Sequence, residues 1–552
     1  RDKRHGRIAF NRYTRQDRHV CEPHIARRAA PMSENLTDPN KPPHAVVETD
    51  EHGRVKQNDG TALTPANANP WYVLATVYGE QQSGPHSDDD LHAKNRRIWN
   101  GWMCAALDAS ARQKLAEQLK CDVAELAPLK DQEREDLDAE FNTRLPDSEG
   151  PDPKAAINFN RTYFETYTRF DGFVFPVYAD FQAATFSDMA DFKAATFSDR
   201  AVFEATTFSS LANFSDGTFS NLANFSDGTF SGWAIFESAT FRDNAYFRSA
   251  NFSDWAYFRS ANFSDMADFE AAIFRGLADF EAATFLGRAI FSGRMIFSEK
   301  AIFKAAIFRG LADFDSATFS RRAVFDSATF SGKADFDSAT FSGGANFSDG
   351  AFQGTTDFKN ARFEEHVPKF FQRELHQDTV FTIEDANWPD ITSKNADDGK
   401  RAYTRLRQLM HELHKPDDAH FFFRQEMRCK AELEGPPDSW VIGLYGLIAG
   451  FGYSVTRPAC WLLGMWFVPA LIYVDAFDCT DRFGAEHITE ATPFGLSFTN
   501  LFAFFGLNRV FFGTVIGDFG PWLSFLAGFQ TVTGFILAFF LGLGLRNRFR
   551  LK

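Results

Sequence analysis

The sequence predicts a mainly β solenoid, a rod of stacked coils, with helices at both ends and a membrane domain after it. Two observations carry this prediction. An eleven-residue repeat runs from residue 159 to residue 363, and charge-free apolar segments occupy much of the last hundred residues. A strict short period is typical of a stacked solenoid rather than of a globular catalytic domain.

The repeated unit reads Ala-x-Phe-x-x-Ala-x-Phe-x-x-x, as in residues 190–200, and its register contains 38 of the 65 phenylalanines. In an extended segment, Ala and the Phe two residues later point to the same side, while the residue between them points outward. The Ser-Asp and Ser-Gly spacers favour turns. A helix is excluded, because at about 100° per residue the Ala and Phe positions would be scattered around its whole circumference.

This pattern resembles the bacterial pentapeptide-repeat family, whose unit has Ala two residues before a central Phe or Leu. The resemblance implies a right-handed, four-sided β-helix. The extra residue at every second corner predicts about 22 residues per coil and about nine coils within residues 155–363. Phe291, Phe297 and Phe303 are spaced six and six. We therefore expect a bulge or corner defect at 293–300, with a binding notch as the alternative.

The segment before the repeat changes character twice. Residues 1–31 carry nine Arg or Lys against three Asp or Glu, in a chain of net charge −15, and we interpret them as mis-translated upstream sequence or a basic tail. Residues 32–70 are polar and predicted to be disordered. Residues 71–150 are expected to form a helical cap on the first coil, with Trp99 and Trp102 on one helix face. Nucleic-acid stacking is the alternative role for these two rings.

After the repeat, we expect an αα-hairpin linker in residues 364–440 and a membrane domain in residues 441–552. Residues 458–477 and 522–545 are the predicted spans, because each stretch is apolar and approaches or reaches the ~20 residues needed to cross a bilayer. Residues 494–514 are expected to form a re-entrant or interfacial helix. Basic residues flank the outer ends of both spans and acidic residues fill the loop between them. The positive-inside rule then places both termini and the rod in the cytoplasm, at the inner membrane.

This layout is similar to that of pentapeptide-repeat proteins with a C-terminal two-span, ion-channel-like module. The likeness rests on residues 403–427, on residues 450–453 with Arg457-Pro458, and on residues 542–552. A potassium filter uses the backbone carbonyls of a Thr-Val-Gly-Tyr-Gly loop, whereas this chain has Thr-Val-Ile-Gly-Asp at 514–518. The pore-like candidates are Phe494, Thr514, Val515, Gly517 and Asp518.

The sequence offers no catalytic residue, cofactor motif or metal site, so we expect no enzyme and no cofactor. His411 and His414 are one residue too close for the i, i+4 histidine pair of a zinc-protease helix. The six cysteines show no paired spacing, which indicates a reducing compartment.

We therefore interpret the chain as a membrane-anchored scaffold for protein–protein interaction. Its expected partners are the lipid bilayer, an unidentified protein and, through the membrane domain, further copies of itself. The proposed partner-binding residues are Trp233, Tyr246, Trp255 and Tyr257. The alternative is an ion channel with a solenoid sensor. DNA mimicry toward topoisomerases ranks last, and no nucleic acid is expected, because residues 159–363 carry 25 acidic and 18 basic residues, far short of the charge density of DNA.

Overall fold

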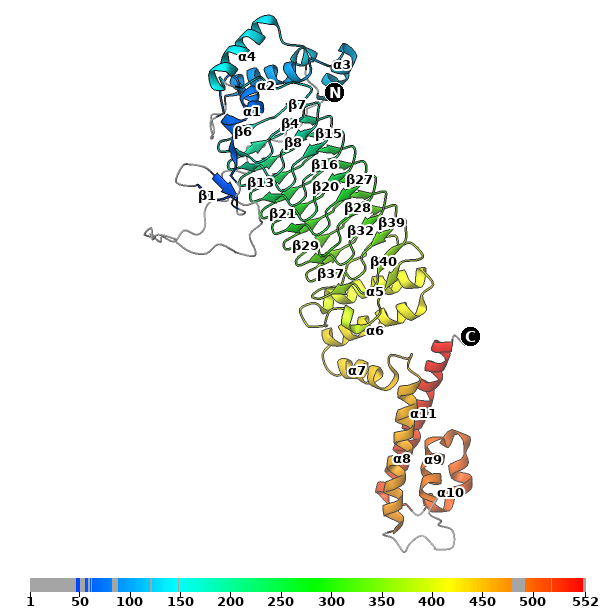
Figure 1. Cartoon of the computed structure of the whole chain (residues 1–552). Helices are drawn as coiled ribbons and strands as arrows, with labels where there is room; N and C mark the ends of the chain where they lie inside the picture. The colour runs from blue at the N-terminus through cyan, green and yellow to red at the C-terminus, as the bar shows by residue number, and fades with distance from the viewer. Residues whose placement is uncertain are drawn as a thin grey trace, which may run out of the picture. The chain divides into compact units, whose positions relative to one another are not determined.

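The computed structural model describes residues 46–49, 55–57, 60, 62–81, 88–119, 122–146, 148–478, 492–517 and 519–549. The expectations for residues 1–31, and for most of residues 32–61, lie outside these ranges. Within them the chain forms a solenoid with helices at either end, followed by a group of apolar helices (Figure 1).

Four parallel sheets run along the solenoid (Figure 1). Their strands are two residues long, apart from β5 (Thr162–Phe164) and β40 (Thr356–Phe358). Partner residues are 22 apart, as in Thr196 and Thr218, so one coil is 22 residues long, as predicted. The sheets run from β3 (Thr64–Pro65) to β41 (Arg362–Phe363), from β4 (Ile157–Asn158) to β42 (Val380–Phe381), from β6 (Thr168–Arg169) to β38 (Ala345–Asn346), and from β7 (Val174–Phe175) to β39 (Ala351–Phe352).

The alternation of five- and six-residue steps between phenylalanines corresponds to two kinds of corner. At the short corner, the amide of Ala184 donates to the carbonyl of Phe181 at 3.0 Å, and Ala183 has φ 55°. This is the backbone of a type II turn, which requires positive φ at its third residue. From Ala183 to Ala282 the same left-handed position recurs every eleven residues and is filled by Ala, Ser or Asp.

The core consists of four columns of stacked phenylalanines with alanines beside them. Within a column, rings of successive coils are nearly parallel, as for Phe203 and Phe225 at 4.8 Å and 3°. Between columns they meet edge to face, as for Phe203 and Phe214 at 5.3 Å and 83°. Both geometries are favourable for aromatic pairs, so each ring is held by its own column and by the next one.

The expected corner defect is confirmed at residues 293–294. Both Gly293 and Arg294 have positive φ, 72° and 67°, and the register steps by 23 residues, from Ile273 to Ile296. Met295 occupies the buried position that alanine fills in the coil before it, at Ala272. The Phe274–Phe297 stack is only slightly longer, at 5.3 Å, so the corner absorbs the extra residue without interrupting the column.

The N-terminal end of the solenoid is covered by helices α1 (Pro70–Ala75), α2 (Asp89–Met103), α3 (Ala109–Leu119) and α4 (Asp131–Arg144). Trp99 of α2 is fully buried, and its indole donates to the carbonyl of Val174 at 2.8 Å. Trp102 donates to the carbonyl of Pro151 at 3.1 Å. Both indole N–H groups thus donate to backbone carbonyls of this chain, as expected of a cap.

The prediction of disorder for residues 32–70 is wrong for the part that the structure describes. Strand β3 (Thr64–Pro65) pairs with β5, and β1 (Val46–Thr49) pairs with β2 (Val55–Gln57). The polar composition of this segment gave no indication of two residues that fix it to the solenoid. Leu63 is buried, and the side-chain amide of Asn69 donates to the carbonyl of Asn158 at 2.9 Å and to Thr162.

The C-terminal end is covered by the predicted helical hairpin, α5 (Ala396–Glu412) and α6 (Pro416–Leu433). The solenoid itself extends past residue 363, because β42 pairs with β40. Phe422 of α6 packs against Trp388 with ring centroids 4.9 Å apart, and Trp388 packs on Phe363. With added strands at both ends, two of the sheets reach eleven strands, so the stack is longer than the nine coils expected.

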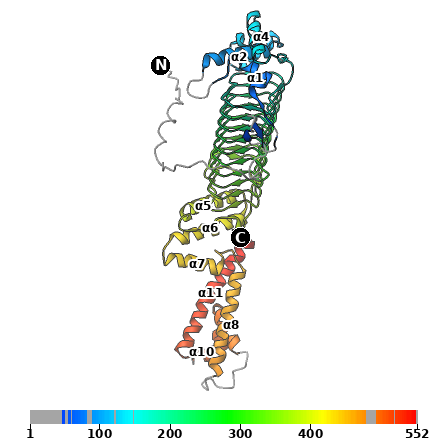
Figure 2. The same ribbon diagram turned by 60° about the vertical axis from the view of Figure 1, so that its left-hand side comes forward.

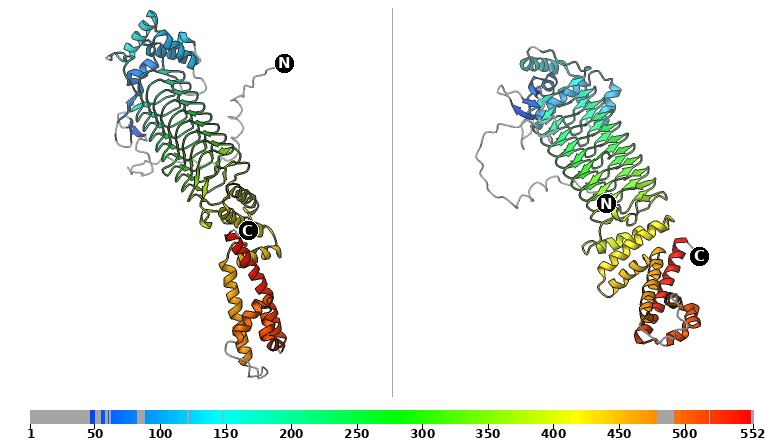
Figure 3. Two further views of the ribbon diagram at one scale, coloured as in Figure 1. Left: turned by 90° about the vertical axis from the view of Figure 1, so that its right-hand side faces the viewer. Right: turned by 60° about the horizontal axis from the view of Figure 1, so that its bottom comes forward.

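The last helices are α7 (Asp438–Ala449), α8 (Thr456–Asp478), α9 (Thr492–Leu501), α10 (Leu507–Gly517) and α11 (Pro521–Phe549). Of the described helices, two are long and apolar enough to cross a membrane, at Thr456–Phe477 and Pro521–Phe549. These two run side by side, with α9 and α10 alongside them (Figures 2 and 3).

Candidate functional site

Three of the four predicted partner-binding residues form one exposed cluster, which we call the aromatic patch: Trp233, Trp255 and Tyr257. The two indoles stack at 5.3 Å and 10°, and the Tyr257 ring meets both edge to face, at 6.3 and 6.1 Å. The 22-residue coil explains this arrangement, because Trp233 and Trp255 occupy the same position in successive coils. Each indole is 43% exposed, so part of this aromatic stack faces solvent.

Tyr246 does not belong to this patch, contrary to the sequence prediction. It lies in β20 (Ala245–Tyr246) of the β4–β42 sheet, whereas Tyr257 lies in β22 (Ala256–Tyr257) of the β6–β38 sheet. The chain visits the four sheets in turn, so these two sheets are opposite faces of the solenoid. Residues eleven apart in the sequence are half a coil apart in the structure. They therefore lie on opposite faces, although they are close in the sequence.

A tyrosine, an arginine and a buried aspartate form a matching unit on each of these faces. Beside the patch, Arg259 Nε donates to Asp279 at 2.6 Å and its guanidinium lies 5.5 Å from the Tyr257 ring centre. On the opposite face, Arg248 pairs with Asp268 and lies 5.9 Å from the Tyr246 ring centre.

Both aspartates are fully buried, so the arginine on each face is held in a fixed place by a charge-assisted hydrogen bond. Burial raises the pKa of Tyr257, which stays a neutral hydrogen-bonding phenol at physiological pH. Sequence reasoning missed these units. The sequence pattern that marks each unit is Tyr-x-Arg, with an Asp 22 residues after the Tyr.

Three of the pore-like residues, Thr514, Val515 and Gly517, lie in the last turn of helix α10 rather than in an extended loop of the potassium-filter type. Phe494 lies in α9, where its carbonyl accepts from the indole of Trp466 at 3.1 Å. Asp518 lies outside the described residues. Residues 514–517 thus end a helix in this structure, and the pore-like role of these residues stays a prediction.

Helix α9 is instead held between α8 and α11 by buried polar side chains. The amide of Gln530 donates to the carbonyl of Met465 at 2.9 Å and to Ser497 Oγ at 2.6 Å. The hydroxyl of Tyr473 donates to Gln530 Oε1 at 3.0 Å, and Asn500 donates to Tyr473 at 3.4 Å. These contacts fall near the middle of α8 and in the first half of α11. Interhelical hydrogen bonds of this kind bind helices together in apolar surroundings.

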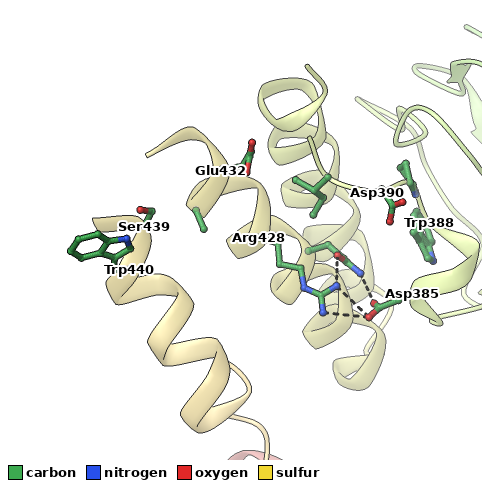
Figure 4. A pocket seen from close by; sticks show the side chains of 11 residues that line it. Asp385, Trp388, Asp390, Arg428, Glu432, Ser439 and Trp440 are labelled. Carbon is green, nitrogen blue, oxygen red and sulfur yellow. Dashed lines mark hydrogen bonds and ion pairs between the residues drawn. The ribbon is translucent and has the colours of Figure 1, made fainter. Parts of the chain in front are cut away.

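An open cleft of about 620 Å³ lies between residues 385–391, α6 and the start of α7 (Figure 4). Its one arginine, Arg428, is 3.3 Å from Asp385 and donates to Gln425 at 3.2 Å, so this charge is engaged within the wall. Asp390 and Glu432 make the remaining lining acidic. Among the described residues, no group of three or more His, Cys, Asp or Glu is placed to hold a metal ion.

Four parallel sheets of two-residue strands around columns of Phe and Ala define a four-sided β-solenoid. The family model for pentapeptide repeats (9 copies) matches residues 325–368. The chain therefore carries pentapeptide repeats in residues 325–368, and the same Ala-x-Phe unit continues through the rest of the solenoid. No curated protein and no solved structure matches it.

Proposed function

We propose that this chain is a membrane-anchored scaffold whose solenoid presents the aromatic patch to a partner protein. The exposed stack of Trp233 and Trp255 on a rigid sheet carries this proposal. Aromatic side chains fixed in place supply a large contact area at low entropic cost, and they are enriched at the energetic centres of protein interfaces.

The apolar helices support the anchoring part of the proposal. Large side chains of α8 and α11, among them Leu463, Phe467, Phe535 and Phe539, are exposed over most of their surface. Such surface is unfavourable in water, at about 25 cal/mol per Å², and favourable against lipid chains. Arg457 and Arg546 lie at the ends of the two helices nearest the solenoid. By the positive-inside rule we place the solenoid and both termini in the cytoplasm, at the inner membrane.

Site-specific photo-crosslinking in cells tests the partner-binding role. We expect a photoreactive amino acid at position 235, beside the patch, to capture a defined protein, and Trp255→Ala to abolish that capture. Position 224, the outward position on the opposite face one coil before Tyr246, with Tyr246→Ala, provides the matched control. Equal capture from both faces, or capture unaffected by Trp255→Ala, would contradict the assignment.

A second candidate function is supported by the placement of α9. A short helix held between two spans by buried polar groups is an arrangement that could line a pore if several copies assembled around it. Ion flux into liposomes containing the chain from Met32 to Lys552, compared with a chain ending before Trp440, tests this alternative. Flux that requires the C-terminal helices would favour a channel with a solenoid sensor, whereas no flux from inserted protein would leave the scaffold.

A further inference from the structure

The loop at residues 450–455, between α7 and α8, is the place where four helices meet. His420 of α6 stacks on Tyr453 with ring centroids 3.9 Å apart. The side chain of Asn547 on α11 donates to the carbonyl of Gly452 at 2.9 Å. Arg457, at the start of α8, donates to the carbonyl of Gly446 on α7 at 2.7 Å. The linker hairpin, α7 and both apolar helices therefore share one junction.

Two arginines, Arg424 and Arg457, lie close to one another at this junction, and Arg546 and Arg548 flank Asn547 on α11. In the described part of the chain, none of them lies within ion-pair distance of a carboxylate, whereas the neighbouring Arg428 is paired with Asp385. Arg424 Nε is buried and has no hydrogen-bond partner among the described residues. Burial and the charges of Arg428 and Arg457, opposed by Asp385, lower the pKa of Arg424. The carboxylate of Asp417 also faces this loop, but it accepts from the hydroxyl of Tyr453. Arg424 and Arg457 thus lie near one another without a carboxylate partner among the described residues.

Helix α7 adds an apolar surface at the same level. One side of it packs on its neighbours through Ile442, Gly446 and Ala449. The other side exposes a continuous row to solvent: Trp440 72%, Val441 64%, Leu444 56% and Leu447 57%. The helix runs across the direction of α8 in Figures 1 and 2, and its twelve residues are too few to cross a bilayer. These are the features of a helix that lies in the plane of a membrane surface, with tryptophan at the headgroup level.

We propose that this junction binds the phosphate headgroup of an anionic phospholipid in the leaflet facing the solenoid. Arg424 and Arg457 would hold the phosphate, because guanidinium groups bind phosphate oxygens through paired, charge-assisted hydrogen bonds. The acyl chains would lie beside the exposed row of α7 and the first turns of α8. A bound phosphate would also offset the mutual repulsion of the arginines. Free phosphate shares the headgroup chemistry but would leave the row of α7 uncovered, so we commit to the lipid.

The inference rests on the membrane anchoring proposed above, and its test separates the two. The full chain is purified in detergent, stripped of lipid, and examined by native mass spectrometry after addition of phosphatidylglycerol, phosphatidylcholine or inorganic phosphate. We expect one phosphatidylglycerol to be retained in preference to phosphatidylcholine, and Arg424→Gln/Arg457→Gln to reduce its retention about tenfold, as the loss of charge-assisted hydrogen bonds implies. The matched control, Arg401→Gln/Arg321→Gln, removes two exposed arginines elsewhere and should leave retention unchanged.

Equal retention of the two lipids by the unmodified chain, a comparison that needs no variant, would overturn the proposal. Competition by inorganic phosphate at equal concentration would overturn the lipid assignment in favour of a simple anion site. Extraction of cell membranes with alkaline carbonate tests anchoring separately. Release of the chain would refute the anchoring and this site with it, whereas a retained chain without lipid preference would refute the site alone.

Discussion

Arg373 shows how a single residue can end a repeat. It occupies the position of the buried repeat alanine, yet it is 1% exposed, and its guanidinium lies 4.2 Å over the ring of Phe352, where the next phenylalanine of the column would stack. It donates to the carbonyls of Asp349 and Phe325. Gly350, one coil earlier, carries no side chain, and a Cβ there would lie 2.3 Å from the carbonyl oxygen of Ala328 and 3.0 Å from Arg373 Nη1. Burial lowers the pKa of Arg373 to about 9, so it is charged at physiological pH.

We expect Arg373→Ala to destabilise the chain, although alanine is the residue that the repeat uses at this position. The loss should be smaller than the roughly 2–4 kcal/mol of an ordinary core truncation, because Nε and Nη2 of Arg373 are buried without a partner among the described residues and their removal offsets part of it. The substitution uncovers the Phe352 ring and leaves two carbonyls without their donor. Arg373→Met, which still covers the ring, should cost less. The urea midpoint followed by circular dichroism measures the effect, with the exposed Arg362→Ala as control. An unchanged urea midpoint for Arg373→Ala would show that the last coil is stable without the Arg373 side chain over Phe352.

At the scale of elements, the N-terminal helices are attached to the first coil by a partly buried charge cluster. His92 of α2 lies 3.0 Å from Asp171, which also accepts from Arg169 Nε at 2.7 Å. Burial opposes ionisation of Asp171, but the hydrogen bonds and charges of His92 and Arg169 outweigh it and lower its pKa. A carboxyl whose folded pKa is below its unfolded value of about 4 stabilises the fold above that pH, and this contribution is lost as pH falls through the folded pKa.

Asp171→Asn should therefore be less stable than the unmodified chain at pH 7, and the difference should shrink below about pH 4. Thermal unfolding of both proteins between pH 7 and pH 2.5 measures this. Asp89→Asn is the control, because Asp89 pairs with Arg169 while 82% exposed, and exposed pairs contribute about 0–1 kcal/mol. A difference for Asp171→Asn that does not depend on pH would mean that its role is steric rather than electrostatic.

The elements that the sequence could predict are those that repeat. Periodicity determines the coil length, the column that each phenylalanine joins, and the stacking of Trp233 on Trp255, because all of these follow from counting in steps of 22. The elements that it could not predict depend on single non-repeating contacts. Strand β3 is held by Asn69, the end of the solenoid by Arg373, and helix α9 by Gln530. No period or composition marks these residues.

At the scale of the whole molecule, the eleven-residue unit predicts that the solenoid tolerates deletions of half a coil as well as deletions of a whole coil. Each coil contains the unit twice, so the core pattern is the same after half a coil. Removing eleven residues should turn everything before the deletion by half a turn about the solenoid axis relative to everything after it, while every Ala and Phe column continues. Removing 22 residues should shorten the stack by one strand spacing, about 4.8 Å, without turning it.

We therefore expect deletion of residues 301–311 and deletion of residues 301–322 both to leave a folded solenoid, because in each case an alanine follows Lys300 as Ala301 does now. Deletion of residues 301–308 should not fold, since it places Ser316 where Phe308 stacks in the core. Circular dichroism and the urea midpoint of the three proteins decide this.

If the eleven-residue deletion unfolds while the 22-residue deletion folds, then the register is set by the outward ion pairs of each face and not by the phenylalanine core. If both fold, the eleven-residue deletion moves the aromatic patch to the other side of the solenoid relative to α8 and α11. Partner capture is then measured in both proteins. Loss of capture in the eleven-residue deletion alone would show that the partner requires the patch in a fixed orientation relative to the membrane.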